Sequence, residues 1–394
     1  MSVWDEVVGQ PDAVRVLSAA AQASADVVAG RPTRVGAMTH AWLFTGPPGS
    51  GRSVAARAFA AALQCPELGC GQCPQCHQVR AGTHADVRLV VPEGLSIPVA
   101  QMRELVLRAA QSPAGGRWQV ILIEDADRLT EAAATALLKT VEEPPPRSVF
   151  LLCAPSTHPD DVSLTIQSRC RVVALRTPSV DAITTVLTGR DGVDPAMARW
   201  AARAAQGHVG RARRLAHDEE ARARRRTVLG VPGALTGLGA CFEVADELIT
   251  AMEEEAAALT EPQEQGETDA LKQALGAGGT GKGAAAAGRG SAGQLKELER
   301  VQRSRRTRAQ RDALDRALVD LAAFYRDVLT ARVGARVPAV HGDVPDVIGR
   351  AAHAWTPESV LRRLESVLAC RSAIDLNVKP RIAVEAMTIA LRDG

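Results

Sequence analysis

Gly46-Pro47-Pro48-Gly49-Ser50-Gly51-Arg52-Ser53 is the stretch that decides the fold of the N-terminal half of this chain. It matches the phosphate-loop pattern G-x-x-x-x-G-K-[ST] at every position but one. The glycines allow backbone N–H groups to curl around phosphate oxygens, and Ser53 is the residue expected to hold a magnesium ion. An apolar run, Ala41–Thr45, precedes the stretch, and a helical pattern over Ser53–Leu63 follows it. This context supports a nucleotide-binding loop.

The single departure from the pattern is Arg52, which stands where lysine is expected. A guanidinium is planar and bulkier than an ammonium group, so the exchange is not conservative at a phosphate site. About 42 of the 47 basic residues of the chain are arginine, which indicates that lysine is kept only where it is needed. We therefore expect a phosphate-loop fold with weak or lost hydrolysis, and we leave binding of ATP or ADP with Mg²⁺ open.

Two acidic residues, Glu124 and Asp125, follow the apolar run Gln119–Ile123. A working ATPase places aspartate and then glutamate here, one to hold the water shell of the metal and one to activate the attacking water. The order is reversed in this chain, so we expect water activation to be impaired. The alternative interpretation is that these acids cap the following turn.

Five apolar runs of strand length alternate with helical patterns or Gly/Pro turns in the first half of the chain. They are Ala41–Thr45, Val87–Val91, Gln119–Ile123, Val149–Cys153 and Val172–Leu175. This alternation predicts a parallel sheet covered by helices on both faces. The predicted fold class is therefore α/β for the N-terminal phosphate-loop domain, followed by a small helical domain and an all-helical C-terminal domain.

The strand patterns stop near residue 177, and the predicted domains are residues 1–176, 177–229 and 230–394. A flexible Gly/Ala-rich insertion at about 262–294 interrupts the last of them. Residues 242–269 hold about ten acids and no basic residue, whereas residues 300–316 hold about seven arginines. Solvated helix faces are the simplest interpretation of both stretches. A surface facing DNA or a partner is the alternative for the arginine-rich one.

Four cysteines lie between the first predicted helix and the second strand: Cys65, Cys70, Cys73 and Cys76. Four thiols within about twelve residues can close a tetrahedral site around a structural zinc ion. An iron–sulfur cluster also accepts four thiolates and stays as the alternative, whereas disulfides are disfavoured in a cytoplasmic protein. His77 adjoins the group and is interpreted as a bystander.

The composition is that of a globular protein, with 46% hydrophobic and 23% charged residues. No apolar run approaches the ~18 residues that a membrane span needs, and Met1–Gln10 lacks the features of a signal peptide. The net charge of +2 does not by itself predict nucleic-acid binding. We therefore expect a cytoplasmic protein without contact to a membrane.

Taken together, these motifs resemble those of the AAA+ clamp-loader subunits of bacterial DNA polymerase III. The resemblance rests on six features: Val8-Gly9-Gln10, the phosphate loop, the four cysteines, Ala133–Pro145, Ser168-Arg169-Cys170 and Asn377–Arg381. It covers about the first 220 residues closely and the rest loosely. It implies an AAA+ phosphate-loop domain with an inserted zinc module, a helical lid domain and a helical collar domain.

Two kinds of subunit share these features, and the departures separate them. The gamma/tau motor type keeps the lysine, the Asp-Glu pair and a nucleotide-sensing arginine, whose place is taken here by Gly210 beside Arg211. The sensor position after the fourth strand is also irregular, with Ala154-Pro155-Ser156 where threonine is expected. These losses, together with Arg52, favour the delta prime type. An active gamma/tau-type ATPase and a zinc-containing DNA-binding protein with a vestigial phosphate loop are the alternatives.

The resemblance implies that Arg169 acts as an arginine finger in trans on the ATP site of a neighbour, while this chain hydrolyses little or nothing. A salt-bridged residue at a helix end is the alternative for Arg169. The implied degenerate nucleotide site comprises Val8, Gly46, Gly49, Gly51, Arg52, Ser53, Glu124 and Asp125.

The implied partners are gamma/tau and delta subunits in a hetero-pentameric ring and, through that complex, the sliding clamp and primed DNA in replication. The nucleotidyltransferase activity of the polymerase holoenzyme is expected of other chains.

Overall fold

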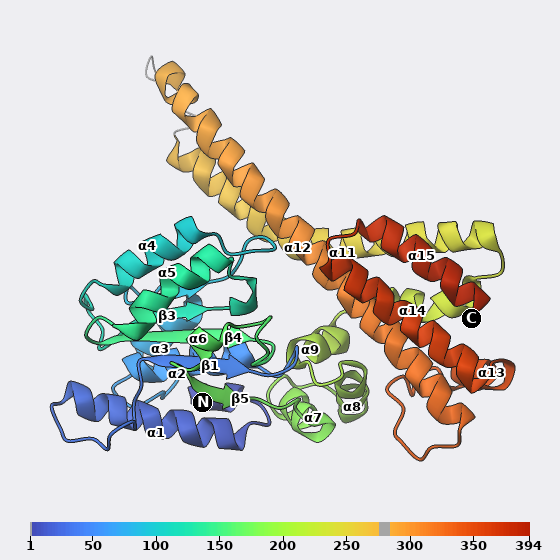
Figure 1. Cartoon of the computed structure of the whole chain (residues 1–394), viewed down its shortest axis with the longest axis horizontal. Helices are drawn as coiled ribbons and strands as arrows, with labels where there is room; N and C mark the ends of the chain where they lie inside the picture. Colours follow the sequence, from blue (N-terminus) through green and yellow to red (C-terminus); the bar gives the residue numbers. More distant parts are fainter. Residues whose placement is uncertain (1, 276–283) are drawn as a thin grey trace. The chain divides into compact units, whose positions relative to one another are not determined.

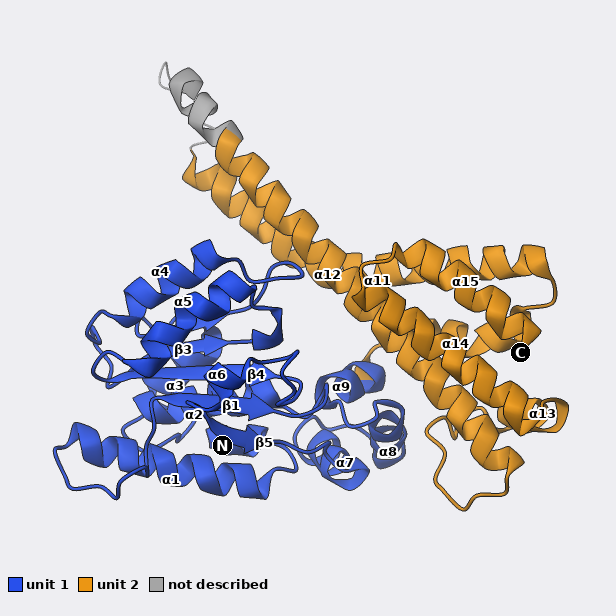
Figure 2. Ribbon diagram, viewed as in Figure 1, with its two compact units in different colours: residues 1–216 blue, residues 217–394 orange. Residues whose placement is uncertain are grey.

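The computed structural model describes residues 2–275 and 284–394, which form two compact units, residues 1–216 and 217–394 (Figure 2). All strands of the described chain lie in the first unit, and the second is helical. The division falls earlier than the predicted boundary at residue 229. The reason is that Val228 and Leu229, near the end of a helix, are buried in the core of the second unit.

The first unit contains one parallel sheet with the strand order β2-β3-β4-β1-β5 (Figure 1). Its strands are β1 (Ala41–Thr45), β2 (Val87–Val90), β3 (Gln119–Ile123), β4 (Ser148–Ala154) and β5 (Arg171–Ala174). The predicted parallel α/β sheet is therefore confirmed, with each strand within one residue of the expected bounds. The central strands β1, β3 and β4 are buried along their whole length, as continuous apolar runs predict.

Helices cover both faces of this sheet. In β1, Trp42 and Phe44 belong to the core beneath the first two long helices, and Leu43 belongs to the core on the opposite face. The first face carries η1 (Val3–Glu6), α1 (Pro11–Val28), α2 (Arg52–Gln64) and α3 (Pro74–Ala81). The second face carries α4 (Val99–Ala109), η2 (Ala126–Arg128), α5 (Glu131–Glu142) and α6 (Leu164–Gln167).

Three short helices complete the first unit: α7 (Val180–Gly189), α8 (Pro195–Ala204) and α9 (Val209–His217). Side-chain caps precede α7 and α8. The Ser179 hydroxyl accepts from the N–H of Ala182, and the Asp194 carboxylate accepts from the first N–H groups of α8. A helical segment is what the sequence predicts after residue 177.

The second unit consists of α10 (Glu219–Ala234), α11 (Leu238–Ala274), α12 (Ala284–Arg332), α13 (Pro345–Ala354), α14 (Pro357–Asp375) and α15 (Pro380–Asp393). Its core is built mainly from aliphatic side chains, with Phe324, Tyr325 and Leu318 fully buried at its centre. All the regular secondary structure in the described part of this unit is helical, as expected.

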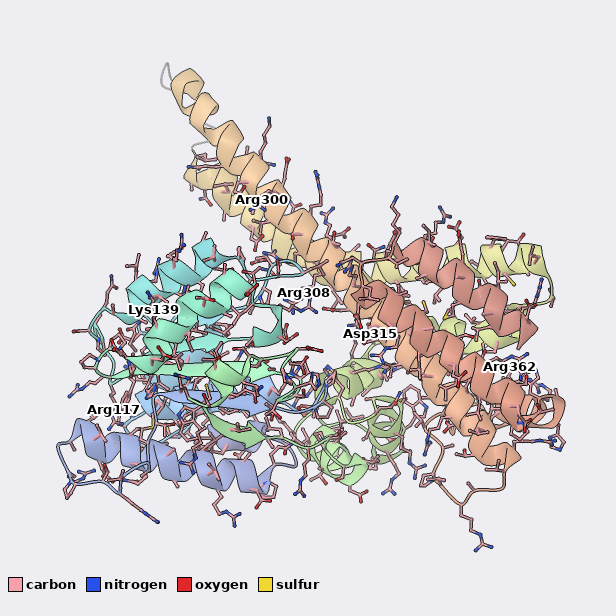
Figure 3. The ribbon with its side chains drawn as sticks, in the orientation of Figure 1. Arg117, Lys139, Arg300, Arg308, Asp315 and Arg362 are labelled. Atoms are coloured by element: carbon pink, nitrogen blue, oxygen red, sulfur yellow. The ribbon has the colours of Figure 1, made fainter. Side chains whose placement is uncertain are left out.

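The long helices α11 and α12 run antiparallel: along their ion pairs, the residue number falls on α11 as it rises on α12. Glu264 pairs with Arg306, and Glu255 pairs with Arg316 at 3.1 Å. Arg305 and Glu267 add a further pair at 2.9 Å. The acidic and arginine-rich stretches of the sequence therefore neutralise each other across one hairpin, in addition to presenting solvated faces. Arg300 and Arg308 mark the arginine-rich stretch in Figure 3.

The described part of the predicted flexible insertion at about 262–294 is helical except for Leu275, which lies in a turn. Helix α11 continues to Ala274 and α12 begins at Ala284, while residues 276–283 lie outside the described residues. The stretch up to Ala274 has a single glycine, Gly266, among Glu, Gln, Ala, Leu and Lys residues that favour helix. Its acids also gain arginine partners on α12, which the composition alone did not indicate.

Among the described residues, no helix combines the length and the hydrophobicity that a bilayer crossing demands.

Candidate functional site

The phosphate loop connects β1 to α2 with a backbone shape that its glycines permit. Gly46, Gly49 and Gly51 have φ angles of 152°, 83° and 90°, a region that residues with side chains rarely adopt. A Cβ on Gly46 would lie 2.5 Å from the carbonyl oxygen of Leu175, so a larger residue does not fit. Helix α2 begins at Arg52 without a side-chain cap on its first N–H groups. This is the local geometry that binds anions in phosphate loops.

Arg52 folds back onto the loop that carries it. Its Nη1 donates a hydrogen bond to the carbonyl oxygen of Gly46 over 2.8 Å. A phosphate-loop lysine instead reaches the phosphates as a compact charge, so the guanidinium here spends one of its donors on the protein. Ser53 lies half-buried in the first turn of α2, the position from which a hydroxyl meets magnesium in such loops.

Glu124 is held by a cation from the neighbouring helix. Nε and Nη2 of Arg57 donate to the same oxygen, Oε1 of Glu124, at 3.1 and 2.6 Å. The Glu124 side chain is only 14% exposed. Because this carboxylate already accepts two charge-assisted hydrogen bonds, it is less available to activate a water molecule.

The acids after β3 and Arg52 gather around one buried region. Burial, followed by the nearby charge of Asp125, raises the pKa of Asp127 above its usual range. Burial also raises the pKa of the Cys153 thiol, and the charge of Glu124 adds to this effect while Arg52 opposes it. The structure therefore brings the loop arginine and both predicted acids together at the carboxyl ends of β3 and β4.

The segment before α1 and the start of α9 close around the phosphate loop. The Gln10 side-chain amide donates to the carbonyl oxygen of Ser50 at 3.1 Å and to that of Arg176, and Val8 lies two residues before it. On the other side, a Cβ on Gly49 would meet the Cα and Cβ of His208 at 2.7 Å. His208 thus lies directly against the loop.

The two predicted sensor positions are occupied differently from an active ATPase. The Ser156 hydroxyl donates to a carboxylate oxygen of Asp161 at 2.5 Å, so the protein itself uses it. Gly210 lies in α9, where the backbone N–H of Arg211 donates to Nδ1 of His208 at 3.2 Å. His208, the residue directly before α9, therefore lies next to Gly49 of the phosphate loop.

The four predicted metal ligands meet at one point. The Sγ atoms of Cys65, Cys70, Cys73 and Cys76 all lie within 4.8 Å of one another, and the Cys65–Cys70 and Cys65–Cys73 separations are both 3.6 Å. Thiolates at ~2.3 Å from a common tetrahedral zinc ion lie about 3.8 Å apart, so the spacing fits. All four are free thiols rather than disulfides.

Backbone N–H groups point at these sulfurs, as expected around thiolates. The N–H groups of Cys70 and Cys73 lie 3.4 Å from the Sγ atoms of Cys65 and Cys70, respectively. Burial opposes ionisation of Cys65, but the N–H groups of Cys70, Gly69 and Glu67 outweigh it and lower its pKa to about 7. These donors favour the charged form of Cys65, whereas burial raises the pKa of Cys73 and of Cys76.

Arg169 lies at the surface, after α6 and before β5. Its Nη1 donates to the carbonyl oxygen of Thr165 at 2.9 Å, and its Nη2 lies 2.6 Å from Oε1 of Glu142. The side chains of Arg169 and Glu142 are 36% and 37% exposed. Arg169 therefore does form the salt bridge that the alternative interpretation expected, but its guanidinium remains accessible to solvent.

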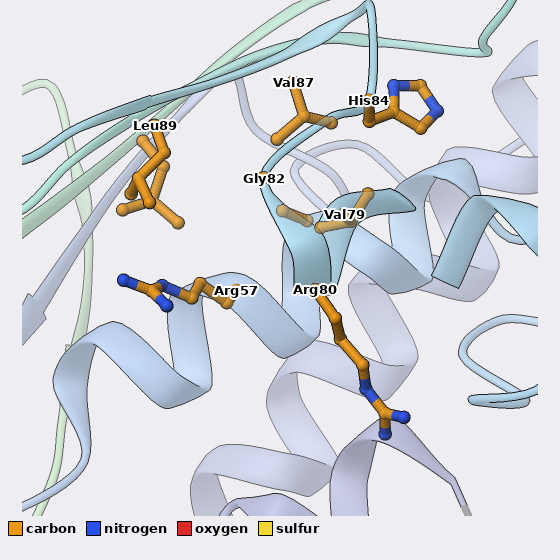
Figure 4. Close-up of a pocket in the computed structure, with 9 residues that line it drawn as sticks. Arg57, Val79, Arg80, Gly82, His84, Val87 and Leu89 are labelled. Atoms are coloured by element: carbon orange, nitrogen blue, oxygen red, sulfur yellow. The ribbon is translucent and has the colours of Figure 1, made fainter. Parts of the chain in front are cut away.

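A small cavity of about 20 Å³ lies between α2, α3 and the β2 edge of the sheet (Figure 4). Arg57, Arg80 and His84 line it together with aliphatic side chains. Its size suits about one water molecule and not a nucleotide. Arg80 also pairs with Glu6 at 2.6 Å, which ties α3 to the N-terminal segment.

Three contact residues of this region were missed at the sequence level: Arg57, His208 and Glu142. Glu142 lies within the Ala133–Pro145 feature, but nothing in that feature indicated its contact with Arg169. Each of the three residues contacts a residue far away in the chain. Gln10 lies within the Val8-Gly9-Gln10 feature, which was the only available signal.

Comparison with known proteins points to one group. Residues 30–179 match the family model described as "DNA polymerase III, delta subunit". A delta prime subunit of DNA polymerase III from Haemophilus influenzae is 40% identical over 144 residues, which are 36% of this chain and 43% of that protein. The delta prime subunit from Bacillus subtilis is 34% identical over 165 residues, 41% of this chain and 49% of that protein.

The tau subunit from Escherichia coli is also similar, 35% identical over 154 residues, 38% of this chain and 23% of that protein. The matches thus span less than half the length of these relatives. The predicted resemblance is confirmed as a similarity: residues 30–179 are similar to the delta prime and tau clamp-loader subunits of DNA polymerase III.

Proposed function

We propose that this chain is a delta prime-type subunit of a DNA polymerase III clamp loader, which supplies Arg169 to the ATP site of a neighbouring motor subunit. The observation that carries the proposal is a contrast between two arginines. Arg52 is turned inward onto Gly46, whereas Arg169 is exposed at the surface and paired with a single exposed carboxylate. The first fits a site that does not hydrolyse nucleotide, and the second fits a group that acts outside its own chain.

The mechanism would be electrostatic. During transfer of the γ-phosphoryl group to water, negative charge spreads over the phosphoryl oxygens, and a guanidinium stabilises it by charge-assisted hydrogen bonds. Glu142 would compete with the phosphate for Arg169. An exposed ion pair of this kind contributes little free energy, so a phosphate can displace the carboxylate at small cost.

The nucleotide site of this chain would be degenerate in the same scheme. Its predicted members are Val8, Gly46, Gly49, Gly51, Arg52, Ser53, Glu124 and Asp125. The pairing of Glu124 with Arg57 and the position of His208 against Gly49 support loss of hydrolysis. Binding of ATP or ADP with Mg²⁺ through the loop N–H groups stays open.

The four cysteines would hold a structural zinc ion, which ties Cys65, at the end of α2, to Cys73 and Cys76, at the start of α3.

We propose gamma/tau and delta subunits as partners in a hetero-pentameric ring that loads the sliding clamp on primed DNA. The first unit would provide the AAA+ and lid parts, and the second unit the collar.

The test is the variant Arg169→Ala in a complex reconstituted with motor and delta subunits. Arginine fingers contribute ~10³–10⁵ in rate in related systems, so DNA-stimulated ATP turnover at the site that this chain completes should fall by a factor of this order. Arg88→Ala is the matched control, because Arg88 is an exposed arginine on β2, at the sheet edge opposite β5. Unchanged turnover at that site in a folded Arg169→Ala variant would reject the proposal.

An active gamma/tau-type ATPase is the second candidate, and the similarity to tau subunits favours it. The isolated chain discriminates the two. A motor subunit turns over ATP alone and loses this activity when Arg52 is replaced by alanine, whereas a delta prime-type subunit shows no turnover that depends on Arg52.

A further inference from the structure

Arg169 is one of four arginines that line a single open groove of about 750 Å³ in the first unit. The others are Arg15 on α1, Arg34 in the loop before β1, and Arg171 at the start of β5. Three segments far apart in the sequence thus place their guanidinium groups around one space. Among the described residues that line it, none is acidic.

Two of the four cations already have carboxylate partners at the rim. Arg169 pairs with Glu142, and Arg15 pairs with Asp12 at 2.6 Å in a fully solvated contact. Arg34 is exposed and forms no ion pair within the described part of the chain. The groove therefore carries positive charge that its own rim does not neutralise.

Arg171 is held in place by its neighbours. Its guanidinium lies over the ring of Trp42, 5.1 Å from the centroid, and its Nη1 lies 3.4 Å from the carbonyl oxygen of Gly36. A stacked guanidinium keeps its edge free for an anion while it loses little conformational freedom on binding. Arg171 is thus a preorganised hydrogen-bond donor for an anion, in the same groove as the exposed side chain of Arg34.

The remaining lining residues are uncharged and mostly small. Ala19 and Ala20 of α1 and Gly36 and Ala37 of the loop before β1 are among the lining residues, so part of the space between the arginines is bounded by small groups. Planar guanidinium forks match the oxygens of phosphate groups, and a chain of phosphates can contact several of them at once. The groove is open, and none of the described residues that line it carries an aromatic ring to receive a base.

We infer that this groove receives the triphosphate of a nucleotide held by a neighbouring chain, with Arg34 and Arg171 contacting phosphates other than the one that Arg169 meets. The inference rests on the proposed function, since it places further residues at the same site. A triphosphate held by a neighbouring chain fits this groove best, because the uncompensated positive charge is grouped around Arg169. A free nucleotide would find no enclosed site for its base in the open groove.

The test compares Arg34→Ala with Arg169→Ala in the reconstituted complex, with the Michaelis constant for ATP and the turnover number measured separately. Loss of a ground-state phosphate contact should raise KM for ATP about tenfold in Arg34→Ala and leave kcat within about twofold. Arg169→Ala should lower kcat instead. Arg34→Lys, which keeps the charge but not the fork, should give an intermediate KM.

Arg88→Ala serves as the control for loss of an exposed arginine, and its KM should not change. An unchanged KM in Arg34→Ala, beside a lowered kcat in Arg169→Ala, overturns the inference and leaves the proposed function intact. A normal kcat in Arg169→Ala overturns both. Weaker assembly of the Arg34→Ala complex with an unchanged KM would instead identify an acidic protein segment as the occupant, and it would also reject the inference.

Discussion

Two Arg–Glu pairs in the first unit have the same N–O distance but differ in the burial of their carboxylates. Arg57 and Glu124 approach to 2.6 Å beside the phosphate loop; Glu124 is only 14% exposed, whereas Arg57 is 42% exposed. Arg169 and Glu142 also approach to 2.6 Å, but both side chains are more than a third exposed. The inner pair removes a carboxylate from the chemistry of its own site. The outer pair can exchange its carboxylate for another anion, because water screens it and its strength is low.

The largest difference between the pairs is expected on removal of the inner cation. Arg57→Ala leaves the Glu124 carboxylate partly buried without two of its donors, so the free energy of unfolding should fall by about 1–2 kcal/mol. Urea unfolding of the isolated chain measures it. A double-mutant cycle with Glu124→Gln should give a coupling energy well above that of Arg169 with Glu142. Equal coupling energies would remove the distinction between the two pairs.

A smaller effect is expected on removal of the outer anion. Glu142→Gln should change the free energy of unfolding by less than about 1 kcal/mol, because exposed ion pairs contribute little. In the reconstituted complex it should raise ATP turnover by up to about fivefold, since Arg169 no longer has to leave a charged partner. A tenfold fall in turnover would contradict this, and would mean that Glu142 positions the arginine instead of competing for it.

The inner and outer pairs also differ in how far the sequence could predict them. The sheet was predicted almost to the residue because buried parallel strands such as Gln119–Ile123 are continuous apolar runs. The phosphate loop and the four cysteines could also be predicted from the sequence, because the residues of each motif lie close together in the chain. Arg57 and Glu142 were not, because each pair joins residues that only the tertiary fold brings together.

The hairpin of the second unit shows the same limit. Glycine and alanine content indicated a flexible insertion at about 262–294, yet α11 continues to Ala274. Acids on α11 face arginines on α12, and the two charge runs can be matched only after the antiparallel arrangement is known. The composition identified the acidic run and the arginine-rich run, but it could not show that the two runs pair with each other.

The smallest expected effect tests the electrostatics beside Glu124. Burial and the charge of Asp125 raise the pKa of Asp127, so the folded chain binds a proton more tightly than the unfolded chain at this position. The contribution of this group to stability is therefore present below its unfolded pKa of about 3.9 and is lost as the pH rises through the higher folded value. Asp127→Asn removes the dependence.

The stability of the variant relative to the parent chain should accordingly increase as the pH rises from about 4 toward neutrality, and then stay constant. Thermal unfolding midpoints of the two chains across this range measure the difference. Asp181→Asn, which removes an exposed aspartate of the same unit, is the control for the change of charge alone. A difference that is flat with pH would mean that Asp127 is solvated, and that the region around Glu124 is more open to water, and to catalysis, than its pairing with Arg57 indicates.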